Sequence, residues 1–236
     1  MKVLVLNGSP KGERSNTLNI ARAFVSGFPE DTDIEYVTLS KLDIKPCLGC
    51  FSCWGKSRGK CVINDDMQPI YGKILAADIV VESFPLYFFG MPSIIKAMTD
   101  RCLAFMQPYM GNRTENGTES FHEMRDSTLL EKKLVVISSC GYVDDKPMYP
   151  ALKMQLDLIC GEGKYTGIFC PQGELFVSPM AKRQREGYLS DIRKAGAEFA
   201  ETLSLSEETK KRISKPILSP KGFETITSTH WQQQAE

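Results

Sequence analysis

Residues 3–17, VLVLNGSPKGERSNT, predict the fold of this chain. The apolar run at 3–6 is too short for a helix and is typical of a buried strand. Residues 8–10 contain the Gly and Pro of a turn, and Asn16 or Thr17 can cap the helical pattern that follows. The stretch therefore indicates a strand, a loop and a helix in direct succession.

The loop in this stretch has the chemistry of a phosphate site. Backbone N–H groups at a helix start favour anions, and the hydroxyls of Ser9, Ser15 and Thr17 would add hydrogen-bond donors. The loop lacks both the G-x-G-x-x-G pattern of dinucleotide sites and the G-x-x-x-x-G-K-[ST] pattern of nucleoside triphosphate sites. We therefore expect it to bind a single phosphate monoester.

Length and composition indicate one soluble domain with extensions. The 236 residues include 42% apolar and 25% charged residues, which suffices for a full core. Basic and acidic residues number 29 each, so nothing favours a nucleic acid or an acidic membrane surface as partner. The N-terminus lacks signal-peptide and transit-peptide features, and no apolar stretch reaches membrane-spanning length. In the cytoplasmic protein that we expect, the eight cysteines would be metal-binding, redox-active or buried rather than disulfide-bonded.

Apolar periodicity predicts five strands that alternate with five helices. The expected strands lie at 3–6, 34–39, 78–85, 133–140 and 165–170, and the expected helices at 18–28, 67–75, 92–102, 149–159 and 189–203. This alternation predicts a doubly wound parallel α/β sheet, for which five strands suit the order 2-1-3-4-5. Ligands then bind at the carboxyl ends of strands 1, 3 and 4, where the loops 85–91 and 139–142 would join the phosphate loop.

Two segments fall outside this alternation. Residues 105–131 are polar and lack clear periodicity, which indicates a lid or a contact loop. Residues 206–236 are expected to form an extension that packs on the body or on a partner subunit. We therefore divide the chain into a domain at 1–205, with an insertion at 45–64, and a C-terminal extension at 206–236.

The insertion contains Cys47, Cys50, Cys53 and Cys61 in the pattern C-x2-C-x2-C-x7-C. Three thiolates at this interval can surround a cubane iron–sulfur cluster, whereas structural zinc usually draws on two separated pairs. The spacing favours a cluster, and zinc, a redox disulfide and free thiols stay open as alternatives. The other four cysteines lie in helix or strand patterns and are expected in the core: Cys102, Cys140, Cys160 and Cys170.

Residues 7–17, the loop 85–91 (PLYFFGM) and the segment 47–67 resemble the NADPH-dependent FMN reductase group of flavodoxin-like proteins, specifically its iron–sulfur flavoprotein branch. The resemblance implies a flavodoxin-like fold, an FMN cofactor and a [4Fe-4S] cluster ligated by the four cysteines of the insertion. It also implies which residues bind FMN. The phosphate would contact Ser9, Lys11, Ser15, Asn16 and Thr17; the isoalloxazine would lie along Pro85, Leu86, Tyr87, Phe88, Phe89, Gly90 and Met91; and Ser139, Cys140, Gly141 and Tyr142 would close its other side.

Physical chemistry supports the same placement, because a flavin needs a phosphate pocket, an aromatic or apolar wall and backbone groups near its polar edge. The alternative is that Phe84, Leu86, Phe88 and Phe89 are core residues. The last of the three loops departs from the glycine-rich sequence that is common in the group.

The resemblance implies an FMN-dependent oxidoreductase that passes electrons from NAD(P)H or a reduced carrier to a small acceptor such as a quinone or free flavin. No catalytic acid, base or nucleophile stands out: His122 and His230 are isolated, and Asp65 with Asp66 is expected to cap a helix. A flavin cofactor itself carries out hydride and electron transfer, so such an enzyme does not need a catalytic acid, base or nucleophile from the protein.

Other functions were weighed against this one. An iron–sulfur flavoprotein that relays single electrons from a ferredoxin, and a non-catalytic flavin-binding protein, remain as alternatives. A signalling receiver domain is excluded, because residues 7–9 and 83–85 lack the acidic residues it needs after strands 1 and 3. The resemblance and the long loop predict a homodimer or homotetramer.

Overall fold

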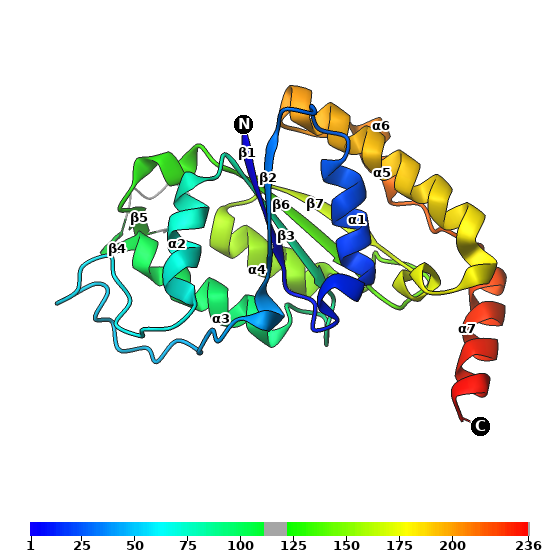
Figure 1. Cartoon of the computed structure of the whole chain (residues 1–236), viewed down its shortest axis with the longest axis horizontal. Helices are drawn as coiled ribbons and strands as arrows, with labels where there is room; N and C mark the ends of the chain where they lie inside the picture. Colours follow the sequence, from blue (N-terminus) through cyan, green and yellow to red (C-terminus); the bar gives the residue numbers. More distant parts are fainter. Residues whose placement is uncertain (111–121, 236) are drawn as a thin grey trace.

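Five parallel strands form the central sheet of the computed structural model, which describes residues 1–110 and 122–235 (Figure 1). The strands lie in the order β2-β1-β3-β6-β7, which confirms the predicted order 2-1-3-4-5 and the flavodoxin-like α/β fold. Their bounds are β1 (Lys2–Asn7), β2 (Asp33–Thr38), β3 (Ile79–Pro85), β6 (Lys133–Ser139) and β7 (Tyr165–Cys170). All four pairings are parallel, with Leu6 of β1 opposite Val37 of β2 and Glu82 of β3.

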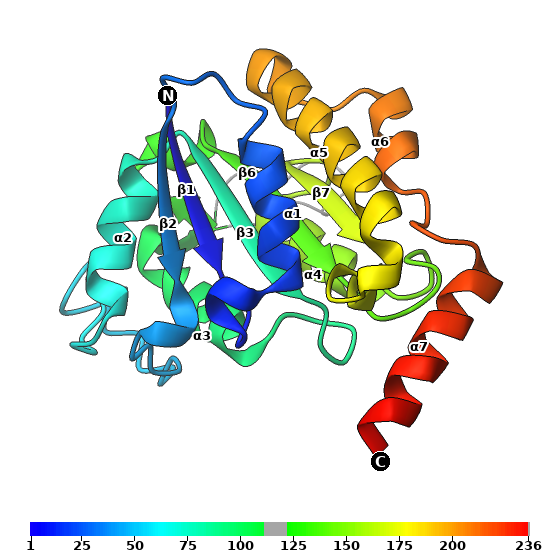
Figure 2. The same cartoon turned by 45° about the vertical axis from the view of Figure 1, so that its right-hand side comes forward.

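Helices cover both faces of this sheet (Figure 2). One face packs against α1 (Asn16–Val25) and α5 (Lys182–Thr202), and the other against α2 (Met67–Ala76), α3 (Ser93–Arg101) and α4 (Pro150–Cys160). Alternate side chains of β1 enter the two cores, Val3 and Val5 on one side and Leu4 and Leu6 on the other. Residues 3–6 of β1 are therefore apolar without interruption, as expected where both faces of a strand are covered.

The crossing of α1 and α5 depends on a glycine. A Cβ at Gly196 would lie 1.8 Å from the carbonyl oxygen of Phe24, so no larger residue can occupy this position without separating the helices. Ile192 and Phe199 flank it in the core, as the predicted helical spacing requires.

Three predicted helix ends are wrong in detail. Ser15 caps α1 in place of Asn16 or Thr17, because its hydroxyl accepts a hydrogen bond from Leu18 N–H at 3.1 Å. Pro92 is the N-cap of α3 rather than its first residue. Leu203, expected on the inward face, is the left-handed C-cap of α5 and is 44% exposed.

The segment 105–131 contains structure that the sequence did not predict. Strands β4 (Met106–Met110) and β5 (His122–Met124) pair antiparallel as a second, two-stranded sheet. The remainder of the predicted loop, residues 111–121, lies outside the described residues.

The C-terminal extension forms α6 (Glu207–Ile213) and α7 (Pro220–Ala235). Ile213 and Phe223 are buried, and Ile226 packs against the same cluster as Phe223, so each helix is anchored on the body, while the C-terminal end of α7 projects away from it (Figure 1). Within the described ranges, no helix combines the length and apolar character needed to cross a bilayer.

Candidate functional site

The first loop of the site is ordered by Asn7, the last residue of β1. Its buried side-chain amide donates to the Gly12 carbonyl at 3.0 Å, and its carbonyl oxygen accepts from Ser9 N–H at 3.1 Å. Gly8 lies against α3, where a Cβ would be 2.2 Å from Ile95 Cγ1. The loop therefore has a fixed path between the sheet and α3.

The predicted phosphate ligands lie along this path. Ser9 and Ser15 are buried and each accepts a backbone N–H, from Lys11 at 3.3 Å and from Leu18 at 3.1 Å. A hydroxyl that accepts a bond keeps its own proton to donate. Lys11 is exposed. The start of α1 thus offers hydroxyl and backbone donors of the kind that bind a phosphate.

The second loop is a tight turn at the end of β3. Tyr87 and Gly90 exchange two backbone hydrogen bonds, of 3.1 and 2.9 Å, across Phe88 and Phe89. Both phenylalanines have positive φ, 44° and 63°, which is uncommon for bulky residues and marks strain. Phe88 is fully exposed and Phe89 is 45% exposed, so neither is a core residue. Phe84 is buried in the core.

The third loop joins the other two. The hydroxyls of Thr17 and Ser139 lie 2.6 Å apart, and Leu86 N–H donates to the Ser139 carbonyl at 2.8 Å. The rings of Phe89 and Tyr142 are nearly parallel, with centroids 6.5 Å apart and 21° between their planes. The structure thus brings the three predicted loops together at the carboxyl edge of β1, β3 and β6.

A fourth segment, 171–174 after β7, was missed by the sequence analysis. The Asn16 side-chain amide donates to the Gly173 carbonyl at 2.8 Å, and Gly173 N–H donates to the Cys140 carbonyl at 2.7 Å. Gln172 is fully buried with φ of 58° and exchanges side-chain bonds of 2.9 and 2.8 Å with Leu218 of the extension. The Pro-Gln-Gly sequence at 171–173, which is typical of a turn, was the only local signal for this segment.

The four cysteines of the insertion line one hollow that is open to solvent. In the described residues, no three His, Cys, Asp or Glu side chains converge on a point suited to a single metal ion. A cubane cluster distributes four irons over four thiolates, so it does not need such convergence. The metal-ligand set therefore stays a prediction, and its donor chemistry fits an iron–sulfur group.

The thiols in this hollow influence one another. Burial raises the pKa of Cys53, and the negative charges of Cys61, Cys47 and Cys50 raise it further. A hydrogen bond from Ser52 lowers the pKa of Cys50. A thiolate is disfavoured beside other thiolates unless a cation compensates their charge. Four cysteines in this arrangement therefore suit the positively charged core of a metal group.

Two arginines fix the insertion to the rest of the fold. Arg101, at the end of α3, pairs with Asp65, and both side chains are fully buried. Arg101 also donates to the carbonyls of Lys45 and Ile63, both at 3.2 Å. The second arginine is Arg125, directly after β5, whose guanidinium donates to the Cys53 carbonyl at 3.1 Å.

Aromatic contacts add to this support. The Trp54 indole donates to the Leu103 carbonyl at 3.2 Å, and its ring packs on Phe51 and on His122 of β5. His122 was expected as an isolated surface residue; it is instead half-buried against Trp54. The side chain of His230 lies outside those described.

Asp65 and Asp66 do not form a paired-carboxylate site. Asp65 accepts from Met67 N–H at 3.1 Å as well as from Arg101, and Asp66 accepts from Asp43 N–H at 2.7 Å. Among the cysteines expected in the core, Cys140 and Cys170 are buried, whereas Cys102 and Cys160 are partly exposed.

Together the fold and site define a doubly wound α/β protein with a hydroxyl-lined loop at its switch point and a separate cysteine-lined hollow. The chain belongs to the family with the flavodoxin-like fold, whose model matches residues 1–160.

Individual relatives agree with this assignment. The chain is 36% identical over 101 residues to an iron–sulfur flavoprotein of Methanocaldococcus jannaschii, covering 43% of this chain and 51% of that protein. It is 32% identical over 149 residues to an FMN-dependent NADH:quinone oxidoreductase of Stenotrophomonas maltophilia, covering 62% of this chain and 71% of that protein. The chain spans about half the length of the first of these.

A solved structure shares the fold. An FMN-dependent NADH-azoreductase of Bacillus anthracis, in complex with FMN, superposes with a TM-score of 0.55 at 18% identity, covering 84% of this chain and 99% of that one.

Proposed function

We propose that this protein is an FMN-dependent oxidoreductase that passes electrons from NAD(P)H to a small acceptor such as a quinone. The observation that supports it best is the convergence of the phosphate loop and the aromatic turn, through the Thr17–Ser139 and Leu86–Ser139 hydrogen bonds. The relatives whose names include FMN and a quinone or NADH are consistent with this chemistry.

In this proposal the chain's own residues bind and orient the cofactor. Ser9, Ser15 and backbone N–H groups at the start of α1 would bind the phosphate. The turn at 85–91 and Tyr142 would flank the isoalloxazine, and the exposed ring of Phe88 would meet the acceptor. FMN, when bound, supplies the hydride and electron chemistry.

Purified protein should be yellow, or become so with added FMN, with absorbance at about 450 nm. It should then oxidise NADH or NADPH in the presence of a quinone, and the ratio of the two kcat/KM values identifies the donor. Protein that neither contains nor binds FMN would contradict the proposal. Protein that binds FMN without oxidising either nucleotide would favour the non-catalytic alternative.

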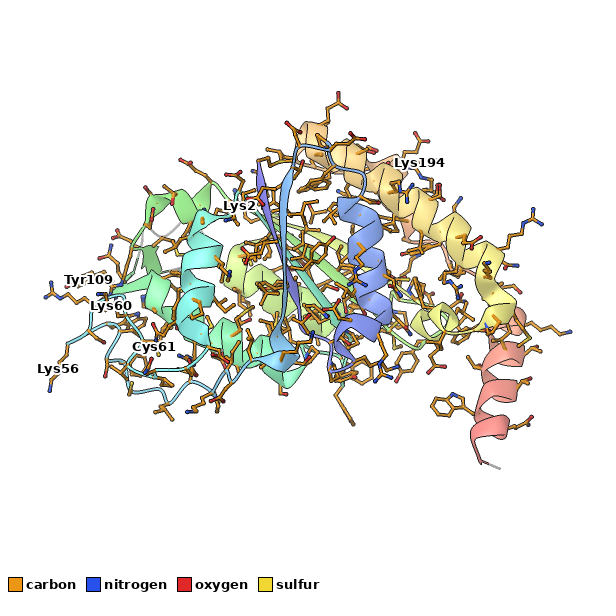
Figure 3. The ribbon with its side chains drawn as sticks, viewed as in Figure 1. Lys2, Lys56, Lys60, Cys61, Tyr109 and Lys194 are labelled. Atoms are coloured by element: carbon orange, nitrogen blue, oxygen red, sulfur yellow. The ribbon has the colours of Figure 1, made fainter. Side chains whose placement is uncertain are left out.

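A second candidate is a relay of single electrons between FMN and a carrier protein such as a ferredoxin, through a cluster at the four cysteines. The surface around the hollow favours it. Leu48, Phe51 and Val62 are more than half exposed there, and residues 44–64 contain four basic residues and no acidic one. Lys56 and Lys60 lie with Cys61 and Tyr109 at this end of the molecule (Figure 3).

An apolar centre with a charged rim is typical of protein interfaces, and its charge suits an acidic carrier. Reduced ferredoxin should then reduce the bound flavin at a rate that falls steeply with ionic strength. A rate that does not respond to salt, or protein without iron and acid-labile sulfide after anaerobic preparation, would contradict the relay.

We also propose a homodimer or homotetramer, since the strained, exposed turn at 88–89 and the projecting α7 suit contacts with a second copy. Light scattering that gives a monomer of 26.4 kDa would contradict this.

A further inference from the structure

Arg101 is a buried cation directly beside the cysteines. It is 2% exposed and ends α3, where it lines the same hollow as the four cysteines. Of the described residues around that hollow, it is the one cation; Asp100, the one acidic residue there, pairs with Lys96. Cys61 is among the groups whose negative charge acts on the Arg101 guanidinium.

The hydrogen bonds of Arg101 leave one of its three nitrogens without a partner among the described residues. Its two terminal nitrogens donate to Asp65 and to the carbonyls of Lys45 and Ile63. Its Nε is buried and has no hydrogen-bond partner among the residues that the structure describes. An unpaired buried donor is destabilising, and more so on a charged group, so a ligand that accepts this hydrogen bond would remove a penalty that the protein alone leaves in place.

A cluster ligated by four thiolates is anionic and gains a further negative charge when it accepts an electron. Hydrogen bonds to the sulfurs and nearby charge both set its reduction potential, and a buried charge such as that of Arg101 is screened less by water than an exposed one. Sulfur acceptors beside Arg101 would satisfy its Nε–H.

We propose that Arg101 donates its Nε–H to the iron–sulfur group held by Cys47, Cys50, Cys53 and Cys61, and that its charge raises the reduction potential of that group. This inference rests on the proposed cluster. It assigns Arg101 a role beyond holding the insertion to α3.

Asp65 provides the matched control, because it is the other half of the same buried pair. Arg101→Gln removes a positive charge from the site, whereas Asp65→Asn removes a negative charge and keeps Arg101. Both variants break one ion pair and lower stability. A purely structural role predicts similar effects of the two variants on the cluster, whereas an electrostatic role predicts potentials that move in opposite directions.

The experiment uses the full chain, loaded anaerobically with iron and sulfide, with iron counted per protein and the cluster potential measured by titration followed by EPR. We expect Arg101→Gln to lower the potential and Asp65→Asn to raise it. Each shift should be at least tenfold in the ratio of oxidised to reduced cluster at a fixed ambient potential, or about 59 mV for one electron. Arg101→Lys keeps the charge but lacks Nε–H, and should fall between wild type and Arg101→Gln.

Loss of the cluster in Arg101→Gln with retention in Asp65→Asn also supports the proposal. Equal loss in both, or potentials within error of wild type, overturns it. If Arg101→Gln does not fold, Arg101→Lys decides: a potential equal to wild type overturns the assigned Nε–H bond. Wild-type protein that takes up no iron overturns the proposed cluster itself. The iron count distinguishes this outcome from a failure of the role assigned to Arg101.

Discussion

The side-chain hydroxyls of Thr17 and Ser139 lie 2.6 Å apart, although 122 residues separate them in the chain. Thr17 belongs to the first turn of α1 and Ser139 ends β6. Both are buried. This contact connects the predicted phosphate loop directly to the loop expected to close the flavin ring, and Gly173 connects them a second time through its bonds to Asn16 and Cys140.

Replacement of Thr17 by Val should therefore affect both stability and FMN binding. The variant keeps the shape of the side chain but leaves the Ser139 hydroxyl unpaired, which costs about 1–3 kcal/mol. We expect FMN to bind roughly tenfold more weakly, which corresponds to about 1.4 kcal/mol. Urea unfolding and FMN titration measure the two effects. In the control Thr225→Val, at an exposed position of α7, both should change little; equal effects in the two variants would contradict the role of Thr17.

Phe88 adopts φ of 44° with a fully exposed ring, an arrangement that stability does not explain. Asn tolerates this conformation better, so Phe88→Asn should gain about 0.5–1 kcal/mol of stability while losing most of the quinone reductase rate. Leu203→Asn, also at positive φ and exposed, should gain similar stability with no change in rate. A Phe88→Asn enzyme with unchanged kcat/KM for the quinone would exclude this ring from acceptor binding.

Burial raises the pKa of Glu82, in the middle of β3, from 4.5 to about 7. Between these pH values the folded state binds more protons than the unfolded state, so Glu82 lowers stability as the pH rises through this window. At about pH 8, Glu82→Gln should be more stable than wild type by roughly 3 kcal/mol, and the difference should disappear below about pH 4.5. Urea unfolding across this range tests it, with the exposed Glu201→Gln as control. A gain that does not depend on pH would contradict the assignment.

Arg125 links the β4–β5 sheet to the insertion through the Cys53 carbonyl. Arg125→Met should loosen the insertion, so that its backbone opens more often. Trypsin should then cleave after Lys56, Arg58 and Lys60, whose side chains are already exposed, several times faster than in wild type. Arg183→Met removes one exposed arginine from α5 and serves as the matched control. Mass spectrometry of limited digests measures the rates; equal rates in both variants would show that Arg125 does not hold this segment.

Local patterns were sufficient for the sheet and its order, because each strand of the central sheet is a short apolar or alternating run and a helical pattern separates it from the next strand. The three loops could also be placed, since the carboxyl ends of β1, β3 and β6 must meet in a 2-1-3-4-5 sheet. The β4–β5 pairing was not predictable from periodicity, because both strands are short, Pro108 lies within β4, and residues 111–121 separate the two strands in the chain.

The role of Arg101 had no local signal either. It is the last residue of an ordinary helix, and its burial depends on Asp65, 36 residues earlier in the chain. The wall at 171–174 likewise depends on contacts with Asn16 and Leu218 that are remote in sequence. Positions fixed by long-range polar contacts are those that single-sequence reasoning misses.

The proposed function depends most on the loop from Ser9 to Thr17, which we expect to bind the phosphate of FMN. The most direct test compares the affinity of the protein for FMN with that for riboflavin, which lacks the phosphate, by fluorescence titration. We predict that FMN binds roughly 100-fold more tightly, because several hydrogen bonds to a charged phosphate are lost with riboflavin. Equal affinities for the two flavins would contradict this account of the loop.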